Sequence, residues 1–251
     1  MEDTGDQRFM AAVPVVGRTY SAQRLVRLGD VDAGGRLRLD AVARYLQDIA
    51  TDDAVDAGLR SAMSWVVRRT VIRVERTARF REPLTLTTFA SGYGRSWAER
   101  RTAIRGEQGA VIEVAALWVS IDATTGRPAP LDEGFVRVYG EAVGGRKIRA
   151  RLAHPDPTPG LDREPWAVRS TDFDALDHVN NAVYWEVVEE HLARRPDLTA
   201  PFTVAVAHRN AVERDRTVGV EAMADSDGGL WVWVVGAEDE VVHASARVWP
   251  G

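Results

Sequence analysis

Apolar residues recur at helical spacing in two separate stretches of the chain. In residues 42–50 they fall three and four positions apart, with Tyr45 and Ile49 on the same stripe, as on one face of a helix. Residues 183–192 carry a second stripe, and Pro196 limits its far end because proline cannot continue a helix. Asp40 stands where an N-cap side chain would start the first helix. The pattern therefore predicts two amphipathic helices.

Short β-rich runs, separated by proline- and glycine-containing turns, follow each predicted helix. One further strand is expected ahead of each helix. The predicted strands after the helices lie at residues 65–74, 84–92, 96–105, 111–121, 202–207, 217–224, 230–236 and 241–249. An antiparallel sheet wrapped around an amphipathic helix buries the helix stripe and one sheet face together. The predicted fold class is therefore α+β.

The two helix-and-strand units begin with the same pattern. Residues 27–33 and residues 169–175 both read R-x-x-D-x-D-A, each shortly before a predicted helix. Residues 146–165 are rich in proline and poor in apolar residues, as expected of a connection. We therefore divide the chain into an N-terminal repeat at residues 1–145, a linker at 146–165 and a C-terminal repeat at 166–251.

Composition narrows the functional classes. The chain has 251 residues, a formal net charge of −5 and no cysteine. Disulfides, thiolate metal ligands and a cysteine nucleophile are therefore excluded, and a nucleic-acid binder is not favoured. No stretch approaches the roughly 20 apolar residues of a membrane span, and the acidic start does not resemble a secretory signal, so we expect a cytoplasmic protein. Arginines cluster between residues 68 and 81, either as ordinary solvated cations or as a basic face for an acidic partner.

The most specific motif lies at residues 172–184. This stretch, DFDALDHVNNAVY, resembles the signature D-x-D-x-N-x-H-V-N-N-x-x-Y of acyl-ACP thioesterases. Residues 45–50, YLQDIA, are similar to that family's Y-L-Q-D/E-x-A, and residues 65–69 resemble its W-V-x-R/K segment. The resemblance implies two tandem hotdog repeats, each a central helix wrapped by an antiparallel β-sheet. It also implies an acyl thioester substrate, an acyl carrier protein as partner, and no metal or organic cofactor.

Thioester hydrolysis needs an activated water or nucleophile, polarisation of the carbonyl and a proton for the leaving thiol. His178 can transfer protons near neutral pH, and Asp174 can orient a water, act as its base or attack directly. Residues Val179, Asn180, Asn181 and Ala182 open the second helix, so their main-chain N–H groups can bind a developing oxyanion. The structural alternative is that the aspartates and asparagines here are only cap and turn residues.

The first repeat lacks the proton-transfer group. Asp30 and Asp32 hold the places of Asp172 and Asp174, but Gly34-Gly35-Arg36-Leu37 stands where the H-V-N-N run begins in the second repeat. We therefore assign this repeat to structure and acyl binding. Its helix stripe, including Tyr45 and Ile49, either lines a hydrophobic tunnel or packs as core.

The chain departs from the family's pattern at two places. Leu176 stands where the family usually has an asparagine, and a leucine side chain makes no hydrogen bond. The family's Glu-Cys pair on a later strand has no cysteine here, although Glu213 lies near the corresponding place and can serve as a carboxylate partner. Asp174, His178 and Glu213 are therefore the candidate catalytic residues.

The predicted function is hydrolysis of acyl-ACP to free fatty acid and holo-ACP. The alternatives are an acyl-CoA thioesterase and a non-catalytic acyl-binding hotdog protein, the latter motivated by Leu176 and the missing cysteine. A hotdog hydratase is disfavoured because the spacing from Asp174 to His178 does not fit the D-x-N-P-x-H pattern. Two repeats in one chain can pair internally as a monomer, or an exposed sheet edge can make a homodimer.

Overall fold

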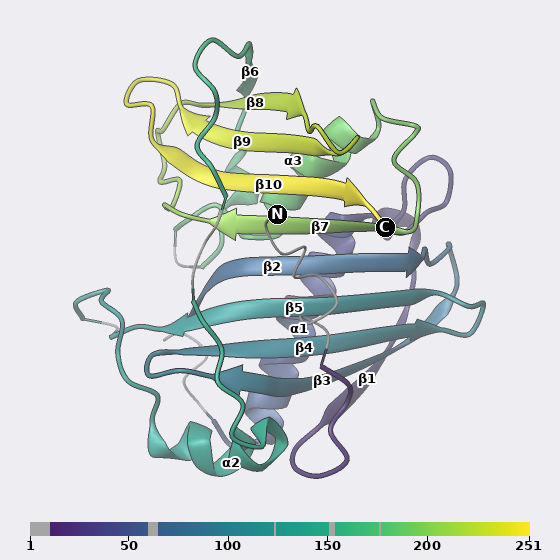
Figure 1. Cartoon of the computed structure of the whole chain (residues 1–251), viewed down its shortest axis with the longest axis vertical. Helices are drawn as coiled ribbons and strands as arrows, with labels where there is room; N and C mark the ends of the chain where they lie inside the picture. Colours follow the sequence, from purple (N-terminus) through teal and green to yellow (C-terminus); the bar gives the residue numbers. More distant parts are fainter. Residues whose placement is uncertain (1–10, 60–64, 123, 151–153, 176) are drawn as a thin grey trace.

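The computed structural model of the chain describes residues 11–59, 65–122, 124–150, 154–175 and 177–251. Within these ranges, ten strands form one sheet in the order β1-β3-β4-β5-β2-β7-β10-β9-β8-β6 (Figure 1). The strands are β1 (Tyr20–Leu25), β2 (Trp65–Arg76), β3 (Pro83–Tyr93), β4 (Trp97–Gly106), β5 (Val111–Ser120), β6 (Arg163–Trp166), β7 (Phe202–His208), β8 (Val218–Ala224), β9 (Leu230–Gly236) and β10 (Val242–Pro250). All neighbouring pairs run antiparallel.

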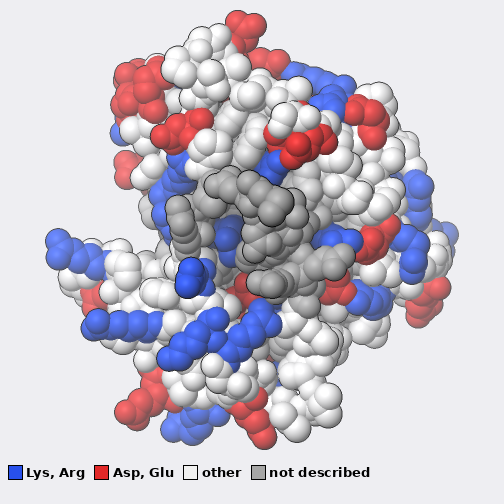
Figure 2. Space-filling view, in the orientation of Figure 1, with Lys and Arg blue, Asp and Glu red and all other residues white. Residues whose placement is uncertain are grey.

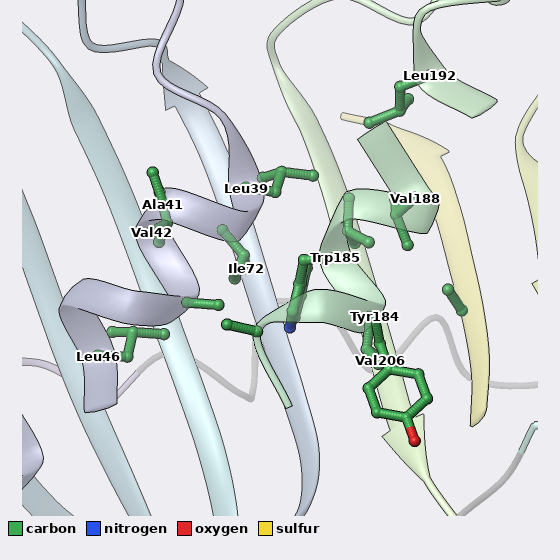
Figure 3. Close-up of a cluster of buried hydrophobic side chains, with 14 of the residues drawn as sticks. Leu39, Ala41, Val42, Leu46, Ile72, Tyr184, Trp185, Val188, Leu192 and Val206 are labelled. Carbon is green, nitrogen blue, oxygen red and sulfur yellow. The ribbon is translucent and has the colours of Figure 1, made fainter. Parts of the chain in front are cut away.

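Two helices cover one face of this sheet. Helix α1 (Leu39–Asp56) lies behind the strands of the first repeat, and α3 (Val183–Leu192) lies behind those of the second (Figure 1). Their apolar stripes meet the inner sheet face in one continuous core. Trp185 of α3 is 1% exposed and lies between the two helices, close to Ile72 of β2 (Figure 3). The same apolar surface therefore holds both repeats together.

The repeats also share a strand pairing. β2 of the first repeat and β7 of the second are paired from Arg69↔Ala207 to Val74↔Phe202, so the two smaller sheets become one. Each half is a central helix wrapped by an antiparallel sheet. The predicted α+β fold of two tandem hotdog repeats is confirmed.

The structure adds a helix that the sequence reading missed. α2 (Glu133–Val143) packs against β3 through Phe135, Tyr139 and Val143, which recur every four residues. Asp132 caps it by accepting a hydrogen bond of 2.6 Å from the Phe135 N–H. The apolar spacing and the capping aspartate were both readable in the sequence.

One local prediction needs correction. Asp40 is not an N-cap: Arg38 occupies that position, and Asp40 is a buried helical residue that forms ion pairs with Arg38 and Arg44. A carboxyl group with two arginines in reach is stabilised as an ion pair and does not need to bond the first helical amides. The strand expected ahead of the second helix is β6, which pairs with β8 at the edge of the sheet.

Candidate active site

A tight turn ahead of α3 carries the two main candidate residues. The Asp174 N–H donates to the His178 carbonyl at 2.9 Å, and the Asp177 N–H donates to the Asp174 carbonyl at 3.0 Å. Asp177 adopts a left-handed φ of 61°, which lets the chain reverse within these few residues. Asp174 is half-buried and His178 is exposed. The turn therefore fixes the backbone of both residues side by side and leaves the imidazole accessible to a substrate.

The loop between β7 and β8 closes over this turn. The Val179 N–H donates to the Val212 carbonyl at 3.2 Å, and Arg214 forms an ion pair with Asp177. The Arg214 guanidinium also stacks 4.5 Å from the centre of the Phe173 ring. Glu213 lies between these two anchored residues, and its side chain is exposed. The contacts of Val212 and Arg214 thus hold the segment that carries Glu213 against the turn.

The second repeat's motif also touches the helix of the first repeat. Gln47 of α1 donates from Nε2 to Asn180 Oδ1 at 2.9 Å, and the same oxygen accepts the Ala182 N–H at 2.9 Å. Asn180 is therefore held from both helices at once. The sequence reading named Asn180 but missed Gln47, whose only signal was its place in the Y-L-Q-D run.

The expected row of free main-chain amides is reduced by the structure. α3 begins at Val183, and the N–H groups of Val179 and Asn180 donate to Val212 and to the Asp172 carbonyl. The Ala182 N–H is taken by Asn180 Oδ1. In the parts of the chain that the structure describes, no group accepts the Asn181 N–H. Among the amides of residues 179–182, that of Asn181 is therefore the remaining candidate for an oxyanion donor.

Tyr184 is a further polar group at this site that the sequence reading used only as part of the motif. Burial raises the pKa of Tyr184 to about 12; a hydrogen bond from the Val212 main chain lowers the pKa by less, and the negative charge of Asp174 adds a smaller increase. Its ring meets His208 edge-on, with the ring centres 5.2 Å apart. The phenol of Tyr184 is therefore a neutral hydroxyl group at neutral pH.

Residues Tyr45 and Ile49 lie in the first repeat. The Tyr45 hydroxyl donates to Asp30 Oδ2 at 2.6 Å, and Ile49 is 1% exposed in the core. They are part of the packed interior and are not brought to the turn that carries His178. Leu176, the residue at the usual asparagine position, lies outside the described residues.

Arg68 is one of the arginines in the cluster at residues 68–81 that form no ion pair in the described parts of the chain. It is half-buried and donates to the Arg209 carbonyl at 2.8 Å, and burial lowers its pKa. No carboxylate pairs with it among the described residues, whereas Arg73 pairs with Glu75. Basic side chains gather at the lower left of the molecule in Figure 2, on the side of the first repeat.

The described ranges contain no group of three or more His, Asp or Glu side chains placed to hold a metal ion. Among the helices placed there, none is long and apolar enough to span a bilayer.

The comparison with protein families decides the relationship. Residues 17–139 match the acyl-ACP thioesterase N-terminal domain, and residues 160–246 match the C-terminal domain. The chain belongs to the acyl-ACP thioesterase family. Family membership thus covers both repeats, including the turn that carries Asp174 and His178.

Solved structures show the same fold. An acyl-ACP thioesterase from Bacteroides thetaiotaomicron superposes with a TM-score of 0.77 at 20% identity, covering 92% of this chain and 97% of that one. The 12:0-ACP thioesterase from Umbellularia californica gives a TM-score of 0.78 at 17% identity, covering 94% and 98%. An uncharacterized protein of Mycobacterium tuberculosis is 28% identical over 224 residues, 89% of this chain and 90% of its own length.

Proposed function

We propose that this acyl-ACP thioesterase family member hydrolyses the thioester of acyl-ACP to free fatty acid and holo-ACP, as a cytoplasmic enzyme. His178 moves the proton to the leaving thiol, and Asp174 orients or activates the attacking water or attacks the carbonyl itself. Asn181 offers its main-chain N–H to the carbonyl oxygen, and Glu213 is a further carboxylate beside the turn. No metal or organic cofactor takes part in this proposal.

One observation carries the proposal. The turn from Asp174 to His178 is fixed by its own main-chain hydrogen bonds, and the amide of Asn181 follows directly at the start of α3. A proton-transfer group, a carboxylate and an N–H donor near the positive end of a helix dipole are what acyl transfer requires. The exposed side of His178 supports access by a substrate carried on another protein.

The test is thiol release from acyl-ACP and acyl-CoA substrates of short to long chain length. We expect steady turnover with purified wild-type protein, and higher kcat/KM on acyl-ACP than on acyl-CoA. A higher kcat/KM on acyl-CoA would mean that the substrate is acyl-CoA, while the proposed hydrolysis mechanism would stand. Acyl binding without turnover on either set would favour a non-catalytic acyl-binding protein.

Variants at the turn locate the chemistry. His178→Ala should lower kcat by roughly 100-fold or more, the scale for losing a general acid–base group. Asp174→Asn keeps the shape of the side chain and should also abolish most turnover. A variant at exposed Glu190 of α3, Glu190→Gln, serves as a matched surface control with wild-type kcat. Full activity in the His178 variant, with the fold intact, would remove His178 from the mechanism.

A further inference from the structure

The turn of the second repeat has a close copy in the first repeat. Both copies follow a short 3-10 helix, and the residue that reverses each chain has positive φ: 76° at Gly35 and 61° at Asp177. Their main-chain hydrogen bonds match one for one. In each matched pair the N–H of the first residue donates to the carbonyl of the second. The pairs are Asp32 to Arg36 and Asp174 to His178, both 2.9 Å; Gly35 to Asp32 at 2.9 Å and Asp177 to Asp174 at 3.0 Å; Arg38 to Asp30 at 2.9 Å and Asn180 to Asp172 at 2.8 Å; and Leu37 to Ala78 at 2.9 Å and Val179 to Val212 at 3.2 Å.

This register sets three pairs of equivalent positions. Arg36 is the counterpart of His178, and Leu39 is the counterpart of Asn181. Continued along the helices, the same register makes Gln47 of α1 the counterpart of Glu189 of α3. Each of the last two side chains reaches across to the start of the other repeat's helix.

In the first repeat a carboxylate fills the position that corresponds to the proposed oxyanion site. Glu189 Oε1 accepts the Leu39 N–H at 2.6 Å, and both carboxylate oxygens accept bonds from the Arg36 guanidinium. Glu189 is only 8% exposed. This copy of the turn therefore holds an internal anion between a helix-start amide and a cationic side chain, an arrangement that strengthens both bonds.

In the second repeat the counterpart is a neutral amide that points elsewhere. Gln47 donates to Asn180 Oδ1, and its contact leaves the Asn181 N–H without an acceptor in the described ranges. A carboxylate at Gln47 would have no hydrogen to donate to Asn180 and would present a negative charge to the Asn181 amide. The two repeats thus differ in the side chain that faces the turn. It is the carboxylate of Glu189 at the first-repeat turn and the amide of Gln47 at the second-repeat turn, which carries His178.

We infer that Gln47 is a positioning residue for the second-repeat site, which it keeps open to the thioester oxygen by fixing Asn180 with a neutral amide. Glu189 closes the equivalent position in the first repeat, so the chain has a single site for the reaction. Gln47 acts through Asn180 and the adjoining Asn181 amide. This inference rests on the proposed hydrolysis and identifies a residue of the first repeat that serves it.

The test replaces the side chains of Gln47 and Glu189 in separate variants. Gln47→Glu should lower kcat about 100-fold, the scale for disabling an oxyanion donor, with KM for the acyl substrate little changed. Gln47→Met, of similar length but without a donor, should lower kcat about 10-fold by releasing Asn180. Glu189→Gln makes the reverse change at the closed copy and should keep wild-type kcat while lowering the melting temperature. Circular dichroism confirms that each variant folds.

The outcomes separate this inference from the proposed function. Wild-type kcat in folded Gln47→Glu, or an equal loss in Glu189→Gln, would overturn the role of Gln47 while leaving hydrolysis established. A wild-type protein without turnover on any acyl-ACP or acyl-CoA would refute hydrolysis, and the role of Gln47 in that reaction would fall with it. The kcat of wild type therefore tests hydrolysis, and the kcat of Gln47→Glu relative to wild type tests Gln47.

Discussion

The buried histidine of β7 predicts how the protein loses stability in acid. His208 is 7% exposed, and neither ring nitrogen has a hydrogen-bond partner among the described residues. Burial, and after it the positive charge of Arg68, lower the pKa of His208 to about 3 from an ordinary value of 6.5. Between these two pH values the unfolded chain binds a proton that the folded chain does not. Above pH 6.5 His208 therefore has no effect on the unfolding free energy that depends on pH. As the pH falls from 6.5 toward 3, protonation of the unfolded chain lowers the unfolding free energy.

The magnitude follows from the size of the pKa shift. Each pH unit in this window costs about 1.4 kcal/mol of unfolding free energy, so acidification from pH 7 to pH 5 should cost about 2 kcal/mol through His208 alone. His154 adds to the effect, because burial lowers its pKa to about 4. Urea titrations at half-unit pH steps measure the unfolding free energy. Replacing His208 with Gln should flatten the dependence on pH by about 2 kcal/mol over this interval, whatever its effect at pH 7.

The double variant His208→Gln with His154→Gln is the internal check. It should be flatter again, because His154 is a second buried imidazole, which bonds Ser245, whereas the His208 ring has no hydrogen-bond partner among the described residues. If the His208 variant lost stability between pH 7 and pH 5 as steeply as wild type, the imidazole would not be held neutral by burial, and the argument would be wrong.

Two further predictions concern packing and the carrier protein. Trp185→Ala should lower the unfolding free energy by about 3 to 5 kcal/mol, because it empties the space between α1 and α3. Val55→Ala, at a residue 71% exposed on α1, is the control and should change the unfolding free energy by less than about 0.5 kcal/mol. Equal effects of the two variants in denaturant melts would contradict the packing argument. Arg68→Glu should raise KM for acyl-ACP about tenfold, the equivalent of about 1.4 kcal/mol, and KM for acyl-CoA much less, since Arg68 has an unpaired charge. Arg73→Glu is the comparison variant at an arginine that is paired with Glu75. Equal changes of KM for both carriers would argue against docking at Arg68.

The strands were predictable because their signals are local. β9 lies at residues 230–236 as predicted, and the other strands after the two helices differ from the prediction by one or two residues at an end. Alternating apolar positions and turn residues mark these boundaries in the sequence itself. The internal repeat of the R-x-x-D-x-D-A pattern was enough to infer two similar units.

The parts that failed depend on contacts between distant residues. Asp40 has the residue type of an N-cap, but Arg38 and Arg44 engage it and Glu189 takes the first helical amide instead. The amides ahead of α3 looked free because their acceptors, such as the Val212 carbonyl, lie on another segment. The contact of Gln47 with Asn180 joins the two repeats, and no local pattern specifies it.

The pairing of β2 with β7 makes both repeats parts of a single polypeptide sheet, and this has a consequence for how the sequence can vary. In an assembly of two identical chains, every substitution appears twice, so a residue suited to one half must also be tolerated in the other. Here each half is encoded separately. Position 47 can carry an amide while the equivalent position 189 carries an acid, and position 178 can carry a histidine while the equivalent position 36 carries an arginine. The fusion therefore permits one half to specialise in chemistry and the other in support, without a compromise between them.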